Sequence, residues 1–418
     1  MNQKKILTLI YLLCTVLFIF ALIEGCKKDE TSSFTPLDDT NWSPQGIQEV
    51  VSSNNQFALE LYSELSKTEQ GNVFFSPYSL FSTLAILYEG AYDETAQQIK
   101  ELLYLPEADI LRPNYAHLFN LINKPNKAYE LNTTNALWLD ENFPVKEEYI
   151  DIVTSYYGAD VFNLNISGDP EGARQTINSY IEEKTNGRIK DTLPPNSLNH
   201  NTVFVVTNTI YFKGKWLIEF DKSDTTEEDF FVTPDQVIKV NMMHIYDEQF
   251  NYGESEEAQI LELPYKGEAL SMLIILPFES LSDIEPLTYE KLNELIASMG
   301  EATLSVHIPK FKFTTRYELK KTFISLGMQA PFDLASANFS NISPVGSNLY
   351  ITEIYHKAFI RVDEEGTEAA ASSAAVGGCT KAVTIEFRAD HPFIFIIQHK
   401  ETGTILFMGK VTNPIFED

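Results

Sequence analysis

The sequence predicts an α+β fold with mainly antiparallel sheets, on the basis of three observations. Helical periodicity dominates the first part, where Phe57, Leu61 and Leu65 recur four residues apart. From residue 202 onward, β-branched and aromatic runs of strand type replace this pattern. Residues 391–411 read as two apolar strands around a short polar turn, which is typical of a hairpin. Helices followed by strands favour α+β.

The individual elements follow in chain order. Further amphipathic helical turns are expected around Leu84 and Leu87, and again around Ile99, Leu102 and Leu103. Four later runs have the composition of strands. They are TVFVVTNTIYF (202–212), ALSMLIILP (269–277), ATLSVHIPKFKF (302–313) and LYITEIYHKAFIRV (349–362). The final hairpin turns at Glu401, Thr402 and Gly403.

The first 45 residues predict an export signal and a tether. Lys4 and Lys5 precede an apolar run over residues 6–23, so we expect residues 1–25 to be a signal peptide. Cys26 follows Gly25 as in bacterial lipoprotein cleavage sites, where the cysteine becomes lipidated. Glu24 is atypical there, so an uncleaved membrane anchor stays open. Polar residues 26–45 would then be a lipid-anchored tether.

Beyond the tether, the sequence shows no second linker and no repeat, so residues 46–418 are expected to form one domain. The expected location is extracytoplasmic, as an outer-membrane or cell-surface lipoprotein whose partner is the membrane. The formal net charge is −28. This disfavours nucleic acid and other polyanions as partners, since each requires a basic surface. A strongly acidic exterior is otherwise explained by solubility alone.

Motifs for catalysis, metals or cofactors are lacking. The seven histidines show no paired-ligand spacing, and no Gly-x-Ser-x-Gly, phosphate loop or Cys-x-x-Cys occurs. Cys379 is the only cysteine outside the targeting segment, so the folded part has no internal disulfide. A thiol in a Gly-Gly-Cys-Thr stretch lacks the electropositive setting that activates cysteine, which argues against a dyad with His391. We expect no enzyme activity, no cofactor and no metal.

An unusual stretch lies near the C-terminus, where residues 369–379 contain nothing larger than valine. One interpretation is an exposed helical turn or a flexible linker. The other is a segment that enters an existing sheet as a strand, with alternate residues from Thr367 to Ala375 facing the core. Its only charged residue, Glu368, then faces outward. Composition leaves the two interpretations open.

Several long motifs resemble those of the serpin family, in family order over most of residues 47–414. They include NVFFSPYSLFSTLAILYEGAYDETAQQI (72–99), INSYIEEKTNGRIKD (177–191), NTIYFKGKW (208–216), EIYHKAFIRVDEEGTEAA (353–370), FRADHPFIFII (387–397) and FMGKVTNP (407–414). The resemblance implies three mainly antiparallel β-sheets, eight to nine helices and an exposed reactive-centre loop. A target protease would cleave this loop, and the acyl-enzyme would be trapped when the loop inserts into the large sheet.

The resemblance also assigns individual residues. Gly366 matches the hinge glycine and Thr367 the first inward residue, and we expect an ion pair between Lys310 and Glu364. The hinge comprises Glu364, Gly366, Thr367, Glu368, Ala369, Ala370 and Ala371. The cluster beneath the sheet, called the shutter, comprises Ser76, Ser79, Asn208 and His356. The region of first entry, called the breach, comprises Trp216, Lys310 and Glu364.

The expected reactive bond is Thr380–Lys381, counted forward from Gly366. Counting back from Pro392 gives Lys381–Ala382 as the second choice. The implied partner is a serine protease, with a papain-like cysteine protease as an alternative, and the protein is expected to be a monomer. The function implied is suicide-type protease inhibition. The alternative is a non-inhibitory serpin-fold protein with a binding or storage role.

Overall fold

The computed structural model describes residues 34–125, 128–367, 385–414 and 416. One compact unit begins at Leu37. The reason is local packing, because the Leu37 amide donates to Asn120 Oδ1 at 2.8 Å and Trp42 stacks on His117 at 3.7 Å. The signal peptide and Cys26 lie outside the described residues.

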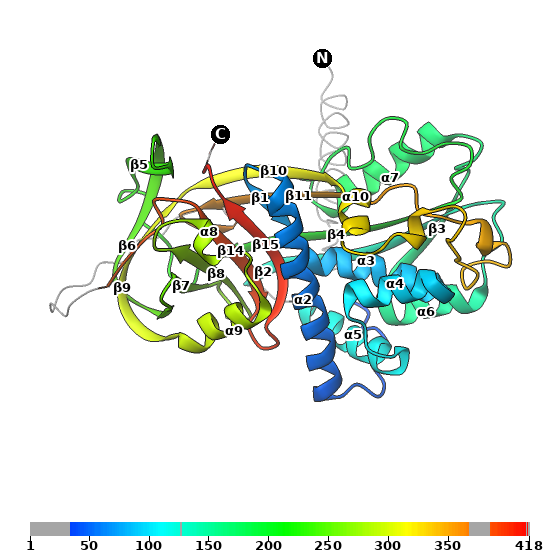
Figure 1. Ribbon diagram of the computed structural model, residues 1–418, viewed down its shortest axis with the longest axis horizontal. Helices are drawn as coiled ribbons and strands as arrows, with labels where there is room; N and C mark the ends of the chain where they lie inside the picture. Colours follow the sequence, from blue (N-terminus) through cyan, green and yellow to red (C-terminus); the bar gives the residue numbers. More distant parts are fainter. Residues whose placement is uncertain (1–33, 126–127, 368–384, 415, 417–418) are drawn as a thin grey trace, which may run out of the picture. The chain divides into compact units, whose positions relative to one another are not determined.

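Nine α-helices occur in the described part of the chain, in agreement with the expected eight to nine (Figure 1). The predicted periodic segments lie in the first three of them. The helices are α2 (Pro44–Thr68), α3 (Pro77–Gly90), α4 (Asp93–Leu103), α5 (Ala108–Ile122), α6 (Glu147–Tyr157), α7 (Pro170–Lys184), α8 (Leu281–Ile284), α9 (Tyr289–Ser298) and α10 (Lys320–Ser325). None of these described helices is long and apolar enough to cross a membrane.

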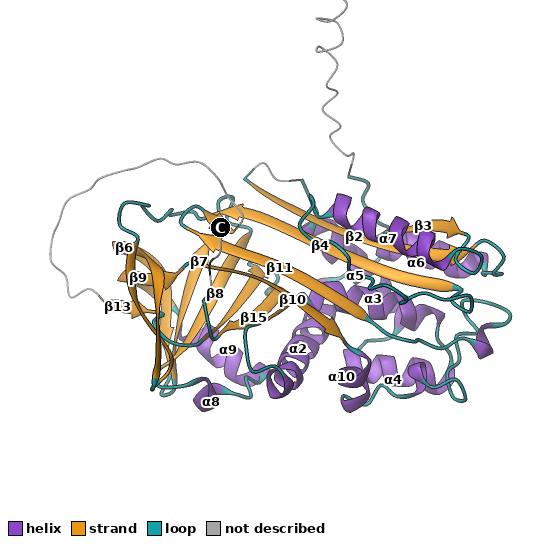
Figure 2. Ribbon diagram, turned by 90° about the horizontal axis from the view of Figure 1, so that it is seen from above, coloured by secondary structure: helices purple, strands orange, loops and turns teal. Residues whose placement is uncertain are grey.

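One sheet has six strands in the order β10-β11-β12-β4-β2-β3 (Figure 2). All neighbours are antiparallel except β2 and β3. β12 is only two residues long and lies between two much longer strands. The bounds are β10 Phe311–Glu318, β11 Tyr355–Asp363, β12 Gly366–Thr367, β4 Phe204–Lys215, β2 Tyr129–Asp140 and β3 Ala159–Leu164.

The other nine strands form a second hydrogen-bonded network. Two of the three expected sheets are continuous in it through the long strand β6, whose register with β9 shifts between Ile245 and Glu248. Pairing is antiparallel except between β9 and β13. The strands are β1 (Val73–Phe75), β5 (Thr226–Thr233), β6 (Gln236–Glu254), β7 (Ala258–Pro264), β8 (Leu270–Pro277), β9 (Gly300–Pro309), β13 (Ile385–Arg388), β14 (Phe393–His399) and β15 (Thr404–Val411).

Two predicted strand segments have different bounds in the structure. The run 302–313 is divided between β9 and β10 at Lys310, whose amide still donates to Asn241 O of β6, whereas Phe311 begins the pairing of β10 with β11. The run 349–362 forms a strand only from Tyr355 onward. Before it, Ile351 donates to Pro331 O, outside any sheet. The terminal hairpin is present as predicted, with Gly403 at φ 70° in its turn.

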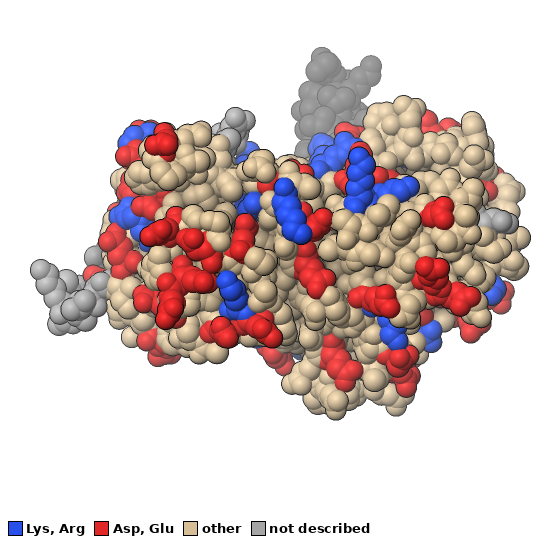
Figure 3. All heavy atoms as spheres, in the orientation of Figure 1, with Lys and Arg blue, Asp and Glu red and all other residues tan. Residues whose placement is uncertain are grey.

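The six-stranded sheet is covered on both faces. Helix α3 packs against β4 on one face and against β15 of the other network. On the opposite face, Ile177 and Ile181 of α7 form a buried cluster with Trp138 of β2. Acidic side chains with basic ones between them are spread over the molecular face drawn in Figure 3. The centre of the six-stranded sheet is therefore enclosed between α3 and α7.

Candidate functional site

The six-stranded sheet contains an open seam between β4 and β11. β4 pairs with β2 along its length, and β11 pairs likewise with β10. On the edges of β4 and β11 that face each other, the only described pairings are those with the two residues of β12. Gly366 lies opposite Lys215 and Asp363, and Thr367 lies opposite Gly214 and Val362. Below Thr367, the two strand edges have no ladder between them in the described residues.

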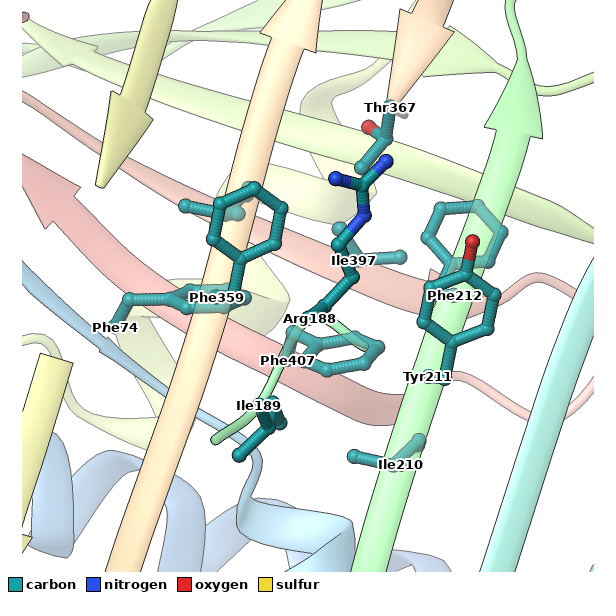
Figure 4. Close-up of a pocket in the computed structure, with 11 residues that line it drawn as sticks. Phe74, Arg188, Ile189, Ile210, Tyr211, Phe212, Phe359, Thr367, Ile397 and Phe407 are labelled. Atoms are coloured by element: carbon teal, nitrogen blue, oxygen red, sulfur yellow. The ribbon is translucent and has the colours of Figure 1, made fainter. Parts of the chain in front are cut away.

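Cavities follow this seam from its upper to its lower end. The first, of about 20 Å³, lies directly below Thr367 and is lined by Phe212 and Phe359 (Figure 4). A second of about 30 Å³ reaches His356. A third of about 200 Å³ lies between residues 203–208 and 349–356. Cavities are expected between two strands that no ladder joins, because no side chains of an intervening strand fill the space between them.

The hinge residues lie at the upper end of the seam. Gly366 has φ 150°, and a Cβ there would lie 2.0 Å from Gly214 O, so no other residue fits this backbone. Thr367 is buried, and its hydroxyl lies 2.7 Å from the Tyr265 hydroxyl. Burial raises the pKa of Tyr265 far above its usual value, so the phenol stays protonated. Thr367 is thus already placed as an inward-facing strand residue.

Three consecutive carboxylates, at residues 363–365, precede Gly366, and each is buried beside a different cation. Burial raises the pKa of Asp363. Burial also opposes ionisation of Glu364, but hydrogen bonds from its own backbone, Lys310 and Thr225 hold its pKa below the usual value. The pairs are Arg361 with Asp363 at 3.0 Å, Lys310 with Glu364 at 3.1 Å and Lys222 with Glu365. The predicted ion pair between Lys310 and Glu364 is therefore present.

Trp216 connects the breach to the hinge. Its indole N–H donates to Asp363 O at 3.0 Å, and its backbone amide donates to Glu365 O at 3.0 Å. Its ring stacks on Tyr265 with centroids 4.6 Å apart. The structure therefore brings Trp216 and Glu364 together with Lys310, as the resemblance implied.

The four shutter residues form one network beneath the seam, in which Ser76, Ser79 and His356 are buried and Asn208 is half-buried. The Ser76 amide donates to His356 Nε2 at 3.1 Å, and the Ser76 hydroxyl donates to Leu406 O at 2.7 Å. Ser79 donates from its amide to Ser76 Oγ and from its hydroxyl to Asn208 Oδ1. Burial lowers the pKa of His356 to about 4, so the ring is neutral and can accept from Ser76.

Sequence reasoning missed several members of these networks. Asn135 on β2 accepts from Asn208 and from Ser82, and its own amide donates to Tyr157 O at 2.6 Å. Tyr265 and Lys222 hold the hinge and were not predicted either. The signal for Asn135 was available as a polar side chain within an apolar strand pattern. Tyr265 gave none, because its partner Thr367 lies 102 residues away in the chain.

Some predicted site residues cannot be placed. Glu368, Ala369, Ala370 and Ala371 of the hinge, the bond alternatives at Thr380, Lys381 and Ala382, and Cys26 all lie outside the described residues. His391, the conceivable catalytic partner of Cys379, has Nδ1 2.9 Å from Asp390 and Nε2 2.7 Å from Pro277 O. Both ring nitrogens are thus engaged in structural contacts.

Comparison with known proteins gives a consistent assignment. A family model described as "Serpin (serine protease inhibitor)" matches residues 52–414. A serpin-like protein of Methanosarcina acetivorans is 39% identical, with all of both chains covered. The leukocyte elastase inhibitor of Xenopus tropicalis is 36% identical over 88% of this chain and all of its own. Human thyroxine-binding globulin, solved in complex with thyroxine, superposes with a TM-score of 0.80 at 28% identity, covering 89% of this chain and all of its own.

Proposed function

This chain belongs to the serpin family, and on that premise we propose that it inhibits a protease by irreversible trapping. Members of this family act as inhibitors or binding proteins rather than as enzymes, and serine proteases are their general targets. The trapping proposed here is cleavage of the loop after Thr367, followed by insertion of that loop between β4 and β11.

The observation that carries this proposal is the seam itself. Two strand edges face each other without a ladder between them in the described residues below Thr367, and a buried N–H or C=O group without a partner is costly. Thr367 already lies between them in antiparallel register with both. A strand continuing from Thr367 would pair with both edges and fill the cavities below it. The small residues that follow suit this narrow space, because large ones would collide with Phe212 and Ile360 in its lining.

The chemistry is that of the family. The nucleophilic serine or cysteine of the protease attacks the carbonyl carbon of Thr380, and the amine of Lys381 leaves as the peptide bond breaks. The product is an acyl-enzyme in which the protease is esterified, or thioesterified, to Thr380. Insertion of residues 368–380 before hydrolysis would carry the bound protease about 40 Å along the sheet. A cut at Lys381–Ala382 would work in the same way.

The alternative function is non-inhibitory binding, and human thyroxine-binding globulin, solved in complex with thyroxine, is an example of a binding protein with this fold. In such a protein the hinge need not enter the sheet quickly. The buried, uncharged Thr367 and the small residues after it favour inhibition, because a bulky or charged inward residue would slow entry. The hinge therefore discriminates between the two functions.

The direct experiment is incubation of the purified protein with a panel of trypsin-like, elastase-like and papain-like proteases. Inhibition predicts a covalent complex that survives denaturing gel electrophoresis, together with a cleaved inhibitor band. A matched sample of each protease with a blocked active site should give no such complex. Complete cleavage without any complex would favour the non-inhibitory function.

We also propose that the protein acts at the cell surface, anchored through a lipid on Cys26. The support is the sequence alone, namely the apolar run over residues 6–23 and the Gly-Cys pair that follows. Residues 26–45 would serve as the lipid-anchored tether. Its polar composition suits a flexible connection to the anchor.

A further inference from the structure

A row of charged side chains crosses the six-stranded sheet at the level just below the hinge. Lys213 of β4 lies opposite Glu130 of β2, and Arg361 of β11 lies opposite Lys312 of β10. These residues share the face covered by α7, since alternate residues of each strand point to the same side. Lys213 and Arg361 therefore lie on opposite sides of the open seam, on the same face of the sheet.

Lys213 has no ion-pair partner among the described residues. It is exposed, and it forms no ion pair with the described carboxylates, although Glu130 is its cross-strand neighbour. Arg361 pairs with Asp363, two residues further along its own strand, at 3.0 Å, and its guanidinium lies 5.2 Å from the centroid of the Phe416 ring. A third cation, Arg188, extends from the segment after α7 into the gap between β4 and β11 and points toward Thr367 (Figure 4). Three cationic side chains therefore lie at the top of the seam on its α7 face.

The register of β12 determines which residue of an inserting strand would lie between Lys213 and Arg361. Thr367 lies opposite Gly214 on one side and Val362 on the other. In antiparallel pairing, the next residue of an inserting strand lies opposite the preceding residue of each neighbour. Residue 368 would therefore lie between Lys213 and Arg361. Its side chain would point away from Tyr265, toward the α7 face, and residue 368 is a glutamate.

We propose that Lys213 and Arg361 form a receiving site for the carboxylate of Glu368, which fixes the register of the inserting strand. This inference rests on the proposed insertion, and it adds which side chains set the register of the inserted strand. A one-residue slip would turn Glu368 toward the apolar core, where an unpaired carboxylate is strongly disfavoured. In the correct register, Glu368 completes an alternating row of Glu130, Lys213, Glu368 and Arg361. Directly opposite residues of unlike charge stabilise a sheet.

The test is a double-mutant cycle on the full-length, loop-cleaved protein. Glu368→Gln and Lys213→Gln are made singly and together, and the melting temperature of each cleaved variant is measured at low salt in a fixed urea concentration. Each single change should lower the melting temperature by about 1–3 °C. The second change should then add little, because the attraction is already lost. The coupling should fade at high salt.

The matched control is Lys357→Gln, which removes a lysine from the same face of β11 four residues from Arg361. In the extended register Lys357 lies opposite residue 372, so its effect should add to that of Glu368→Gln without coupling. The kinetic readout is the stoichiometry of inhibition. Charge reversal by Glu368→Lys should raise it by about 1.5- to 5-fold, because repulsion at the entrance slows insertion.

Two results would overturn the inference, and they distinguish failure of the receiving site from failure of insertion itself. Additive effects of Glu368→Gln and Lys213→Gln, in a wild-type protein that still gains stability on cleavage, would reject the receiving site and leave insertion intact. Failure of the wild-type protein to gain any stability on cleavage would reject insertion itself, and the receiving site with it.

Discussion

The hydroxyl of Thr367 lies 2.7 Å from the hydroxyl of Tyr265, and both side chains are buried. This contact ties the first inward residue of the hinge to a ring that also stacks on Trp216. Gly366 and Thr367 therefore already lie in the sheet at the top of the seam, and below them the described residues show no ladder between β4 and β11.

Thr367→Arg should leave the fold intact and convert the protein from an inhibitor into a substrate. An arginine here would place an unpaired guanidinium beside Tyr265, at a cost on the order of several kcal/mol. Slower insertion allows the acyl-enzyme to hydrolyse first. The measurement is the stoichiometry of inhibition, with Thr367→Ser as the control that keeps the hydroxyl. An unchanged stoichiometry in Thr367→Arg would contradict the insertion mechanism.

Tyr265→Phe should destabilise the intact protein by about 1–2 kcal/mol, because the buried Thr367 hydroxyl loses its partner. The measurement is urea unfolding of the intact chain. Adding Thr367→Val, which removes the stranded hydroxyl, should recover part of this loss. If the two substitutions are strictly additive, the hydrogen bond is not what holds the hinge.

His356 should make stability depend on pH. Burial lowers its pKa to about 4 in the folded protein, from an ordinary value of 6.5. The unfolded state therefore binds the proton more readily, so the contribution is complete above pH 6.5 and is lost as pH falls toward 4. The loss is on the order of 3 kcal/mol. Protonation also removes the acceptor for the Ser76 amide.

The comparison that isolates this effect is wild type against His356→Gln, unfolded in urea across that pH range. His307 also has its pKa lowered to about 4, chiefly by burial, but it is common to both proteins. The difference in unfolding free energy should therefore report His356 alone. Parallel pH profiles for the two proteins would show that His356 does not titrate in this way.

Much of the fold could be predicted from local pattern. The periodicity around Phe57 and the turn at Gly403 are set by neighbours in sequence, and both α2 and the terminal hairpin formed where expected. The division at Lys310 could not be foreseen, because it depends on a change of partner strand from β6 to β11, and both partners are distant in sequence. The lack of strand pairing before Tyr355 could not be foreseen either, because Ile351 of this segment donates to Pro331 O, which lies in another element.

The site residues likewise divide into those that the sequence predicted and those that it did not. Family resemblance identified Trp216, Lys310 and Glu364, which the structure brings together. It did not identify Tyr265 or Asn135, because neither lies in a motif that carries the resemblance. The charge relationship between Lys213 and Arg361 appears only once β12 fixes the register across the seam.

Cys26→Ser should abolish lipidation of the protein. The variant should be retained at the inner membrane by the apolar run over residues 6–23 or released in soluble form. Metabolic labelling with a radioactive fatty acid measures this directly, and Cys14→Ser provides a matched control within the same targeting segment. Equal labelling of wild type and Cys26→Ser would reject the lipid anchor.

The most direct test of insertion is the thermal stability of the protein before and after a single cut in the loop. Brief exposure to trypsin or elastase should cut within residues 377–383, as located by mass spectrometry. Insertion then pairs the free edges of β4 and β11 and buries the small inward side chains. The melting temperature should rise well above that of the intact protein. A cut in this window without any rise would contradict insertion and favour a non-inhibitory role.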